Sequence, residues 1–291
     1  MTLPLPFPKT LLGAALALTA LSSQAVTLVG LTSSNEVARI DTTNVAAATS
    51  MAISGLDAGD RFVGIDLRPG NNTIYGVTLS NKLYTLNEFT GAATFVAGLS
   101  SSIVNSSLGY GIDFNPAADF AGAASLRFVS SAGDNYAINA NTGAVVVATS
   151  IAPGFGGVGY TNSKPNPTVA PAAPSLYYLN SNSDTLAVAT SAFNNPTINN
   201  VGSLGVDVLR ANGFEVLADG SAYAGLNVDG SSLTSGIYRI NLATGAATSV
   251  GTFNGTLSGL TVSAVPEPET YALMLAGLGV VGFMAKRRKA A

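Results

Sequence analysis

The amino-acid sequence predicts an all-β protein, a five-bladed β-propeller built from four-stranded antiparallel blades. Three observations lead to this fold class: a repeat of about 45 to 50 residues, four short β-branched or aromatic runs in each period, and leftover runs at both ends that add up to one more blade. The middle of the chain has no sustained helical period, which argues against α/β repeats.

The repeat is clearest in two matching segments, Gly-Ile-Asp-Leu-Arg-Pro at 64–69 and Gly-Ile-Asp-Phe-Asn-Pro at 111–116. Weaker copies begin at Gly159, Gly213 and Gly259, so successive glycines are 47, 48, 54 and 46 residues apart. A period of this length is typical of propeller blades.

A second marker, a strand-like run that enters a Thr-Gly-Ala turn, follows the same spacing at 90–92, 142–144 and 244–246. We expect these glycines to have a positive φ, which costs other residues energy. Where the period places further turns without glycine, the chain has Asn44 and Asn194, and asparagine is the residue that best replaces glycine in the left-handed region.

The strand-like runs divide into blades in chain order. In the first complete blade the expected strands are 62–67, 73–79, 82–87 and 93–97. Complete blades are expected over residues 61–99, 109–150, 157–204 and 212–253.

The remaining runs are one strand at 257–263 and three strands at 26–32, 36–41 and 49–53. We expect the C-terminal strand to take the innermost position of a fifth blade, beside 26–32, which removes an exposed sheet edge. A twisted solenoid or an open sandwich is the alternative, but neither explains why the leftover strands complete one blade.

Both ends of the chain carry targeting segments. Lys9, an apolar run at 11–21 and Ser23-Gln24-Ala25 predict a signal peptide over residues 1–25 that signal peptidase removes, leaving a propeller domain at 26–264. A buried N-terminal helix is the alternative.

The C-terminal segment 265–291 contains a motif, an uncharged run at 271–285 and a basic end; the motif is Val265, Pro266, Glu267, Pro268 and Glu269, and the basic end is Lys286, Arg287, Arg288 and Lys289.

This order of elements resembles the PEP-CTERM sorting signal, which an exosortase, a membrane transpeptidase, recognises and cuts near the Pro-Glu-Pro motif. A helix over 271–285 reaches only about 22 Å, shorter than the ~30 Å hydrocarbon layer, so we expect transient anchoring, with a permanent single span as the alternative. The basic end predicts a cytoplasmic tail and a propeller on the outer side of the membrane, at the cell surface or secreted.

Composition excludes several functions. Without cysteine or histidine there are no disulfides, no thiolate nucleophile, no Ser-His-Asp triad and no imidazole metal ligand. Between the two targeting segments the chain carries eight basic and 14 acidic residues, a net charge of −6, with no basic cluster, so no nucleic-acid partner is expected.

The paired motifs Gly-Ile-Asp-x-x-Pro and Leu-Tyr-x-Leu-x-x-x-Thr-Gly-Ala-Ala-Thr, the latter at 83–94, resemble a family of exported, propeller-like bacterial domains of unknown function that often precede PEP-CTERM tails. The resemblance covers most of 27–263. This chain departs from the family at 120–125 and 164–174, where residues are inserted. The family offers no catalytic residues to transfer.

Polar residues occupy the third position of the expected innermost strands, near the propeller axis: Asp66, Asp113, Thr161, Glu215 and Thr261. The favoured interpretation is that Asp66 and Asp113 accept backbone N–H bonds and fix their own turns. Alternatively the group binds a cation such as Ca²⁺ through oxygen ligands, or acts on a glycan as an acid and base pair. No catalytic residue and no other cofactor is expected.

The sequence therefore predicts a non-catalytic surface or matrix protein that an exosortase sorts and that binds a polysaccharide, a cation or a protein. The alternative is a secreted glycan-active hydrolase or lyase that uses Asp66, Asp113 or Glu215. A deep axial pocket with carboxylates ~5–9.5 Å apart would favour the enzyme, and a channel filled by Ile65, Ile112 and Phe214 would oppose it. Binding is expected on the side of the Thr-Gly turns, where the insertions 117–125 and 164–175 also lie.

Overall fold

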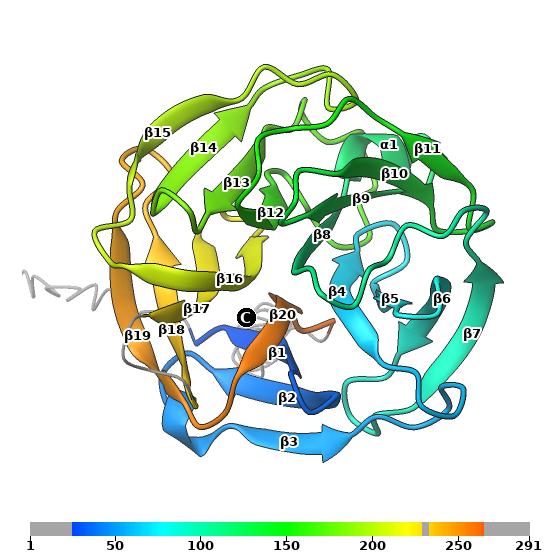
Figure 1. Cartoon of the computed structure of the whole chain (residues 1–291), viewed down its shortest axis with the longest axis horizontal. Coiled ribbons are helices and arrows are strands. Elements are labelled where there is room, and N and C mark those ends of the chain that lie inside the picture. The colour runs from blue at the N-terminus through cyan, green and yellow to red at the C-terminus, as the bar shows by residue number, and fades with distance from the viewer. Residues whose placement is uncertain (1–24, 229–232, 265–291) are drawn as a thin grey trace, which may run out of the picture.

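The computed structural model describes residues 25–228 and 233–264. Five sheets, each of four antiparallel strands, surround a central axis, which confirms the predicted propeller (Figure 1). The expected signal peptide, apart from Ala25, and the sorting motif, apolar helix and basic tail lie outside the described residues.

Four blades are each formed by one continuous stretch of chain, with the first strand innermost. The first two comprise β4 (Phe62–Arg68), β5 (Thr73–Thr78), β6 (Lys82–Leu86) and β7 (Ala93–Gly98), then β8 (Tyr110–Phe114), β9 (Ser125–Ser130), β10 (Asn135–Asn139) and β11 (Val145–Val147). The next two comprise β12 (Phe155–Tyr160), β13 (Leu176–Asn180), β14 (Thr185–Ala189) and β15 (Asn199–Ser203), then β16 (Val208–Val216), β17 (Ala222–Val228), β18 (Ser235–Ile240) and β19 (Ala247–Phe253).

The fifth blade joins the two ends of the propeller. It comprises β20 (Leu257–Val262), β1 (Thr27–Thr32), β2 (Glu36–Asp41) and β3 (Thr49–Ala52). Strand β20 pairs antiparallel with β1, and Leu28 lies opposite Val262. The closure predicted from the leftover strands is therefore confirmed, and it leaves no unpaired innermost strand.

The hydrophobic core lies between neighbouring blades. Val77 and Leu83 of the first blade share a cluster with Phe114 and Leu126 of the second, and the third and fourth blades share an equivalent cluster. Each blade buries its faces against its neighbours, which is why the apolar pattern repeats with the blade.

Each of the three Thr-Gly turns joins its own blade to the blade before it. Gly91, Gly143 and Gly245 have φ of 69°, 74° and 85°, as expected. A Cβ atom at any of them would lie under 3.0 Å from a carbonyl oxygen of the preceding blade, in Ala52, Gly98 and Gly202 respectively. Glycine is thus required both by the turn and by the close approach of two blades.

The prediction that Asn44 and Asn194 replace glycine with a left-handed backbone is wrong. Asn44 has φ of −150°, because the chain enters a short 3₁₀ helix, η1 (Val45–Ala47), in place of a tight turn. In the third blade the left-handed residue of this turn is Ala192, with φ of 53°. Asn194 has another role, since its side-chain oxygen accepts a hydrogen bond from Arg127 Nη2 at 2.9 Å.

The second-blade insertion contains one short helix, α1 (Pro116–Phe120), which the sequence analysis did not predict. The side chain of Asn115 accepts hydrogen bonds from the N–H groups of Ala117 and Ala118, and Pro116 occupies the first turn, a combination that favours helix initiation. The helix places Asp119 beside Arg68, with 2.7 Å between Oδ1 and Nε. The insertion therefore fastens the second blade to the first.

Candidate functional site

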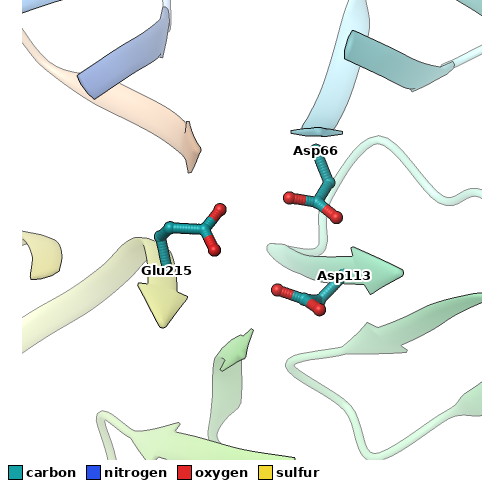
Figure 2. A group of neighbouring side chains, drawn as sticks. All are labelled: Asp66, Asp113 and Glu215. Carbon is teal, nitrogen blue, oxygen red and sulfur yellow. The ribbon is translucent and has the colours of Figure 1, made fainter. Parts of the chain in front are cut away.

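Four of the five predicted axial residues come together. Asp66 on β4, Asp113 on β8, Glu215 on β16 and Thr261 on β20 are all buried. Carboxylate oxygens of Asp66, Asp113 and Glu215 lie within 4.8 Å of one another. Figure 2 shows the carboxyl groups of Asp66 and Asp113 beside each other, with Glu215 reaching towards them from the opposite side of the axis.

Each of these four side chains accepts a hydrogen bond from a backbone N–H of the next blade around the ring. The donors are Phe114 to Asp66 (2.7 Å), Tyr160 to Asp113, Val262 to Glu215, and Leu67 to Thr261 (2.9 Å). The expectation that Asp66 and Asp113 accept backbone bonds holds, but these bonds link neighbouring blades. The axial residues therefore help to hold the blades in register.

The third blade contributes no side chain to this ring. Its equivalent position is Gly159, which lies opposite Tyr177 as Asp66 lies opposite Tyr75. A Cβ atom there would lie 3.0–3.2 Å from Val216 and Phe214, so the neighbouring blade fills the space.

The predicted fifth axial residue, Thr161, lies beyond the end of β12. Its hydroxyl accepts a hydrogen bond from Ser175 N at 2.9 Å and so holds the base of the 164–175 insertion. The sequence repeat predicts Gly159 as the repeat glycine of the third blade, whereas Gly157 is the glycine that packs against Gly111. This two-residue shift keeps the same side-chain alternation, which is why the sequence pattern did not expose it.

Thr261 connects two of the carboxyl groups. Its Oγ1 lies 2.9 Å from Asp66 Oδ1 and 2.8 Å from Glu215 Oε2, and it also accepts the N–H of Leu67. A hydroxyl has one proton to donate, so in this arrangement one of the two carboxyl groups must itself be protonated and donate to Thr261.

Burial favours the neutral form of all three carboxyl groups. It raises the pKa of Asp66 to about 7. Burial, together with the nearby Asp66 and Glu215 carboxylates, raises the pKa of Asp113 well above its usual range, and burial with the Asp66 carboxylate does the same for Glu215. The cluster thus retains protons at pH values where surface carboxyl groups have lost them.

The larger of the two described cavities, about 750 Å³, lies where the innermost strands begin. Serine, asparagine and threonine make up about half of its lining residues, and the others include four leucines, Phe62, Tyr110 and Arg61. We call this cavity the mouth; its serines are Ser33, Ser106, Ser107, Ser131, Ser181 and Ser258. The mouth and the Thr-Gly turns lie at opposite ends of the propeller. The sequence analysis predicts binding at the end with the Thr-Gly turns, so the mouth is not at the predicted end.

The insertions on the expected side are engaged in contacts within the propeller. Asp119 of the first insertion accepts a hydrogen bond from Gly70 N at 2.7 Å, in addition to its contact with Arg68. In the second insertion, Asn166 N donates to Pro69 O at 2.8 Å, which joins the third blade to the first. Both insertions therefore meet over the loop that follows β4.

A group that the sequence analysis missed surrounds the end of β20. Glu88, which is buried, accepts hydrogen bonds from Ser263 Oγ (2.8 Å) and Ala264 N (2.8 Å) and forms an ion pair with Arg39. We call this group the Glu88 clamp. A signal was present, because the other Thr-Gly turns have Ala140 and Leu242 where the first has Glu88.

Two sequence-family models match the chain. One is described as a domain of unknown function (DUF4394) and matches residues 36–261, and the other is the PEP-CTERM protein-sorting motif and matches residues 264–289. No curated protein matches the sequence. In the described part of the chain, helices reach neither the length nor the hydrophobicity that a membrane span requires.

Several solved structures are similar to this one. A protein of unknown function from Bacteroides thetaiotaomicron VPI-5482 has a TM-score of 0.49 and 14% identity, over 80% of this chain and 64% of its own. The calcium-binding protein regucalcin from Agrobacterium tumefaciens has a TM-score of 0.39 and 11% identity, over 76% and 67%. Dihydro-heme d1 dehydrogenase NirN has a TM-score of 0.38 and 15% identity, over 78% and 45%.

Proposed function

We propose that this protein is a non-catalytic surface or matrix protein whose mouth binds a polysaccharide. The chain belongs to the DUF4394 family of domains of unknown function, and it carries a PEP-CTERM motif that indicates export and exosortase sorting. A signal peptide at 1–25 and a transient C-terminal anchor are parts of this proposal. The observation that carries it is the position of the sorting motif, which begins at residue 264, two residues after β20 closes the ring.

The lining of the mouth supports a carbohydrate ligand. Hydroxyl and amide groups match the alternating donors and acceptors of sugar hydroxyls, and Phe62 and Tyr110 add aromatic surface. Among the described residues that line the mouth, Arg61 is the one that carries a charge, so a neutral or weakly acidic exopolysaccharide fits better than a polyanion.

The glycan-active alternative is disfavoured by the closure of the axis. Asp66, Asp113 and Glu215 line neither of the two described cavities, and no more than 3% of any of them is exposed. The residues that precede them in the chain, Ile65, Ile112 and Phe214, are buried as well. A glycosidic bond would need to reach carboxyl groups that the blades enclose.

Sorting is tested by fractionating cells with and without the exosortase and measuring the intact mass of the protein. With the enzyme, we expect release of a product that lacks residues 1–25 and the segment after the Pro-Glu-Pro motif. Without it, the protein should stay with the membrane and keep its tail. An identical mass and location in both strains would contradict exosortase sorting.

Ligand binding is tested with the exopolysaccharide of the producing cell by isothermal titration calorimetry. Ser106→Trp should fill part of the mouth and abolish binding, because Ser106 is exposed and lines this cavity. Ser101→Trp is the matched control, since Ser101 is also exposed in the same loop but is not among the residues that line the mouth. Equal binding by both variants would exclude the mouth as the site.

A further inference from the structure

We propose that Asp66, Asp113 and Glu215 together bind one divalent cation, Ca²⁺, with the hydroxyl of Thr261 as an additional ligand. This site is separate from the mouth, and it does not depend on the proposed polysaccharide. Its role would be to cross-link the first, second and fourth blades at the axis.

The distances fit a shared ion. Calcium binds oxygen ligands at roughly 2.3–2.6 Å, so two oxygens on opposite sides of the ion lie about 4.6–5.2 Å apart. One oxygen from each of the three carboxyl groups lies within 4.8 Å of the others. All three can therefore contact one ion placed between them with only small movements of their side chains.

A second observation points to a missing partner. Among the described residues, Asp113 Oδ1 is a buried oxygen that lacks a hydrogen-bond partner, although Asp113 is only 1% exposed. Figure 2 shows the Asp113 carboxyl group directed into the space that it shares with Glu215 and Asp66. Buried polar atoms are nearly always satisfied, and a cation in this space would satisfy this one.

The available donors are too few for three carboxylates. One hydroxyl, that of Thr261, and backbone N–H groups from the neighbouring blades approach the cluster, and no basic side chain forms a hydrogen bond with it in the described residues. The described Arg68 and Arg127 side chains are instead bound to Asp119 and Asn135. A doubly charged ion would displace the protons that these carboxyl groups otherwise retain and would balance their charges where they converge.

The ligand chemistry selects calcium. The site offers up to six carboxylate oxygens and a hydroxyl, all hard ligands, and the chain has neither the histidine nor the cysteine that zinc favours. Magnesium usually keeps several waters, which a cluster enclosed by five blades does not accommodate. Calcium accepts a larger and less regular set of protein oxygens.

The test uses the full chain after treatment with EGTA and removal of the chelator. Equilibrium dialysis with Ca²⁺ followed by elemental analysis should give one tightly bound ion per chain, and the midpoint of thermal unfolding should rise with the Ca²⁺ concentration because the ion binds the folded state. A stripped, folded chain that binds no Ca²⁺ would overturn the proposal.

The ligands are tested with the amide variants Asp113→Asn and Glu215→Gln, which keep side-chain size but remove a charge. Each should weaken Ca²⁺ binding on the order of tenfold or more. Asp219→Asn is the control, since Asp219 lies in an exposed turn. Unchanged affinity in folded Asp113→Asn or Glu215→Gln would assign the ion to another place.

Terbium gives a result even if these variants fail to fold. The chain has no tryptophan, so Tb³⁺ bound at the axis is sensitised by tyrosine, and Tyr75 and Tyr223 lie opposite Asp66 and Glu215 in the neighbouring strands. In the unmodified chain Tb³⁺ emission should therefore appear on binding and fall when Ca²⁺ is added. A folded chain that gives no emission, or emission that Ca²⁺ does not displace, would overturn the proposal.

Discussion

Gly91 lies where the turn of the first blade touches the outer strand of the fifth. Its carbonyl oxygen accepts the N–H of Ser54 at 3.0 Å, its φ is positive, and the position of its missing Cβ overlaps the carbonyl of Ala52. The recurrent Thr-Gly motif therefore indicates a contact between two blades as well as a turn within one blade.

Gly91→Ala should lower the free energy of unfolding by about 3 kcal/mol, because the left-handed backbone is strained and the added methyl group pushes two blades apart. Gly59→Ala is the matched control: Gly59 has φ of 78°, but nothing lies within 4 Å of its Cβ position. It should lose only about 1 kcal/mol from backbone strain. Urea unfolding measures both, and equal losses would show that the contact between blades is not the cause.

The salt bridge between α1 and the end of β4 is the contact that fixes the second-blade insertion. Asp119 has a fully buried side chain and accepts from both Arg68 Nε and Gly70 N. Arg68 Nη1 also donates to Asn141 at 2.7 Å, so this guanidinium joins two elements of the second blade to the first.

Asp119→Ala should destabilise the protein by about 3 kcal/mol, because it leaves the partly buried Arg68 and the N–H of Gly70 without their acceptor. Asp57→Ala is the comparison: Asp57 pairs with Lys82, but 57% of its side chain is exposed, and such pairs contribute about 1 kcal/mol or less. Thermal unfolding distinguishes the two. A loss of similar size in both variants would contradict a structural role for α1.

At the scale of the elements, the strands were predictable because each blade repeats the same alternation and the same turn. The strands were expected at 62–67 and 257–263 and are observed as β4 (Phe62–Arg68) and β20 (Leu257–Val262). What the sequence could not predict depends on contacts between blades. The periodicity allows either Gly157 or Gly159 as the repeat glycine, and only the packing of Gly157 against Gly111 decides between them.

The repeat in the sequence also predicts the axial residues of the candidate site, except in the third blade. Asp66, Asp113, Glu215 and Thr261 follow their repeat glycines by two residues, so the repeat alone places them on the axis. The ligand remains a prediction. The Glu88 clamp was missed because Glu88, Arg39 and Ser263 are far apart in the chain, and only the closure of the ring brings them together.

At the scale of the molecule, closure by β20 makes the stability of every blade depend on the last strand. The β20 strand pairs with β1 on one side, and the Thr261 hydroxyl accepts the N–H of Leu67 in the first blade on the other. The contacts of the Glu88 clamp then hold the residues that follow.

A chain that ends at Asn254 should lose cooperative thermal unfolding or melt far below the full chain, because it exposes an innermost edge and two blade faces. A chain that ends at Ala264 should keep the midpoint of the full chain, since it retains β20 and the clamp. Differential scanning calorimetry compares the three. Similar melting of the Asn254 chain would show that closure contributes little.

The two ends of β20 open on opposite sides of the ring. Leu257 and Ser258 border the mouth, whereas Ala264, after the other end of the strand, is held by the Glu88 clamp beside Asn72. Strand β20 thus sets an orientation for the whole molecule. A support held close to Ala264 would therefore face the side of the Thr-Gly turns, and the serine-lined opening would point away from that support.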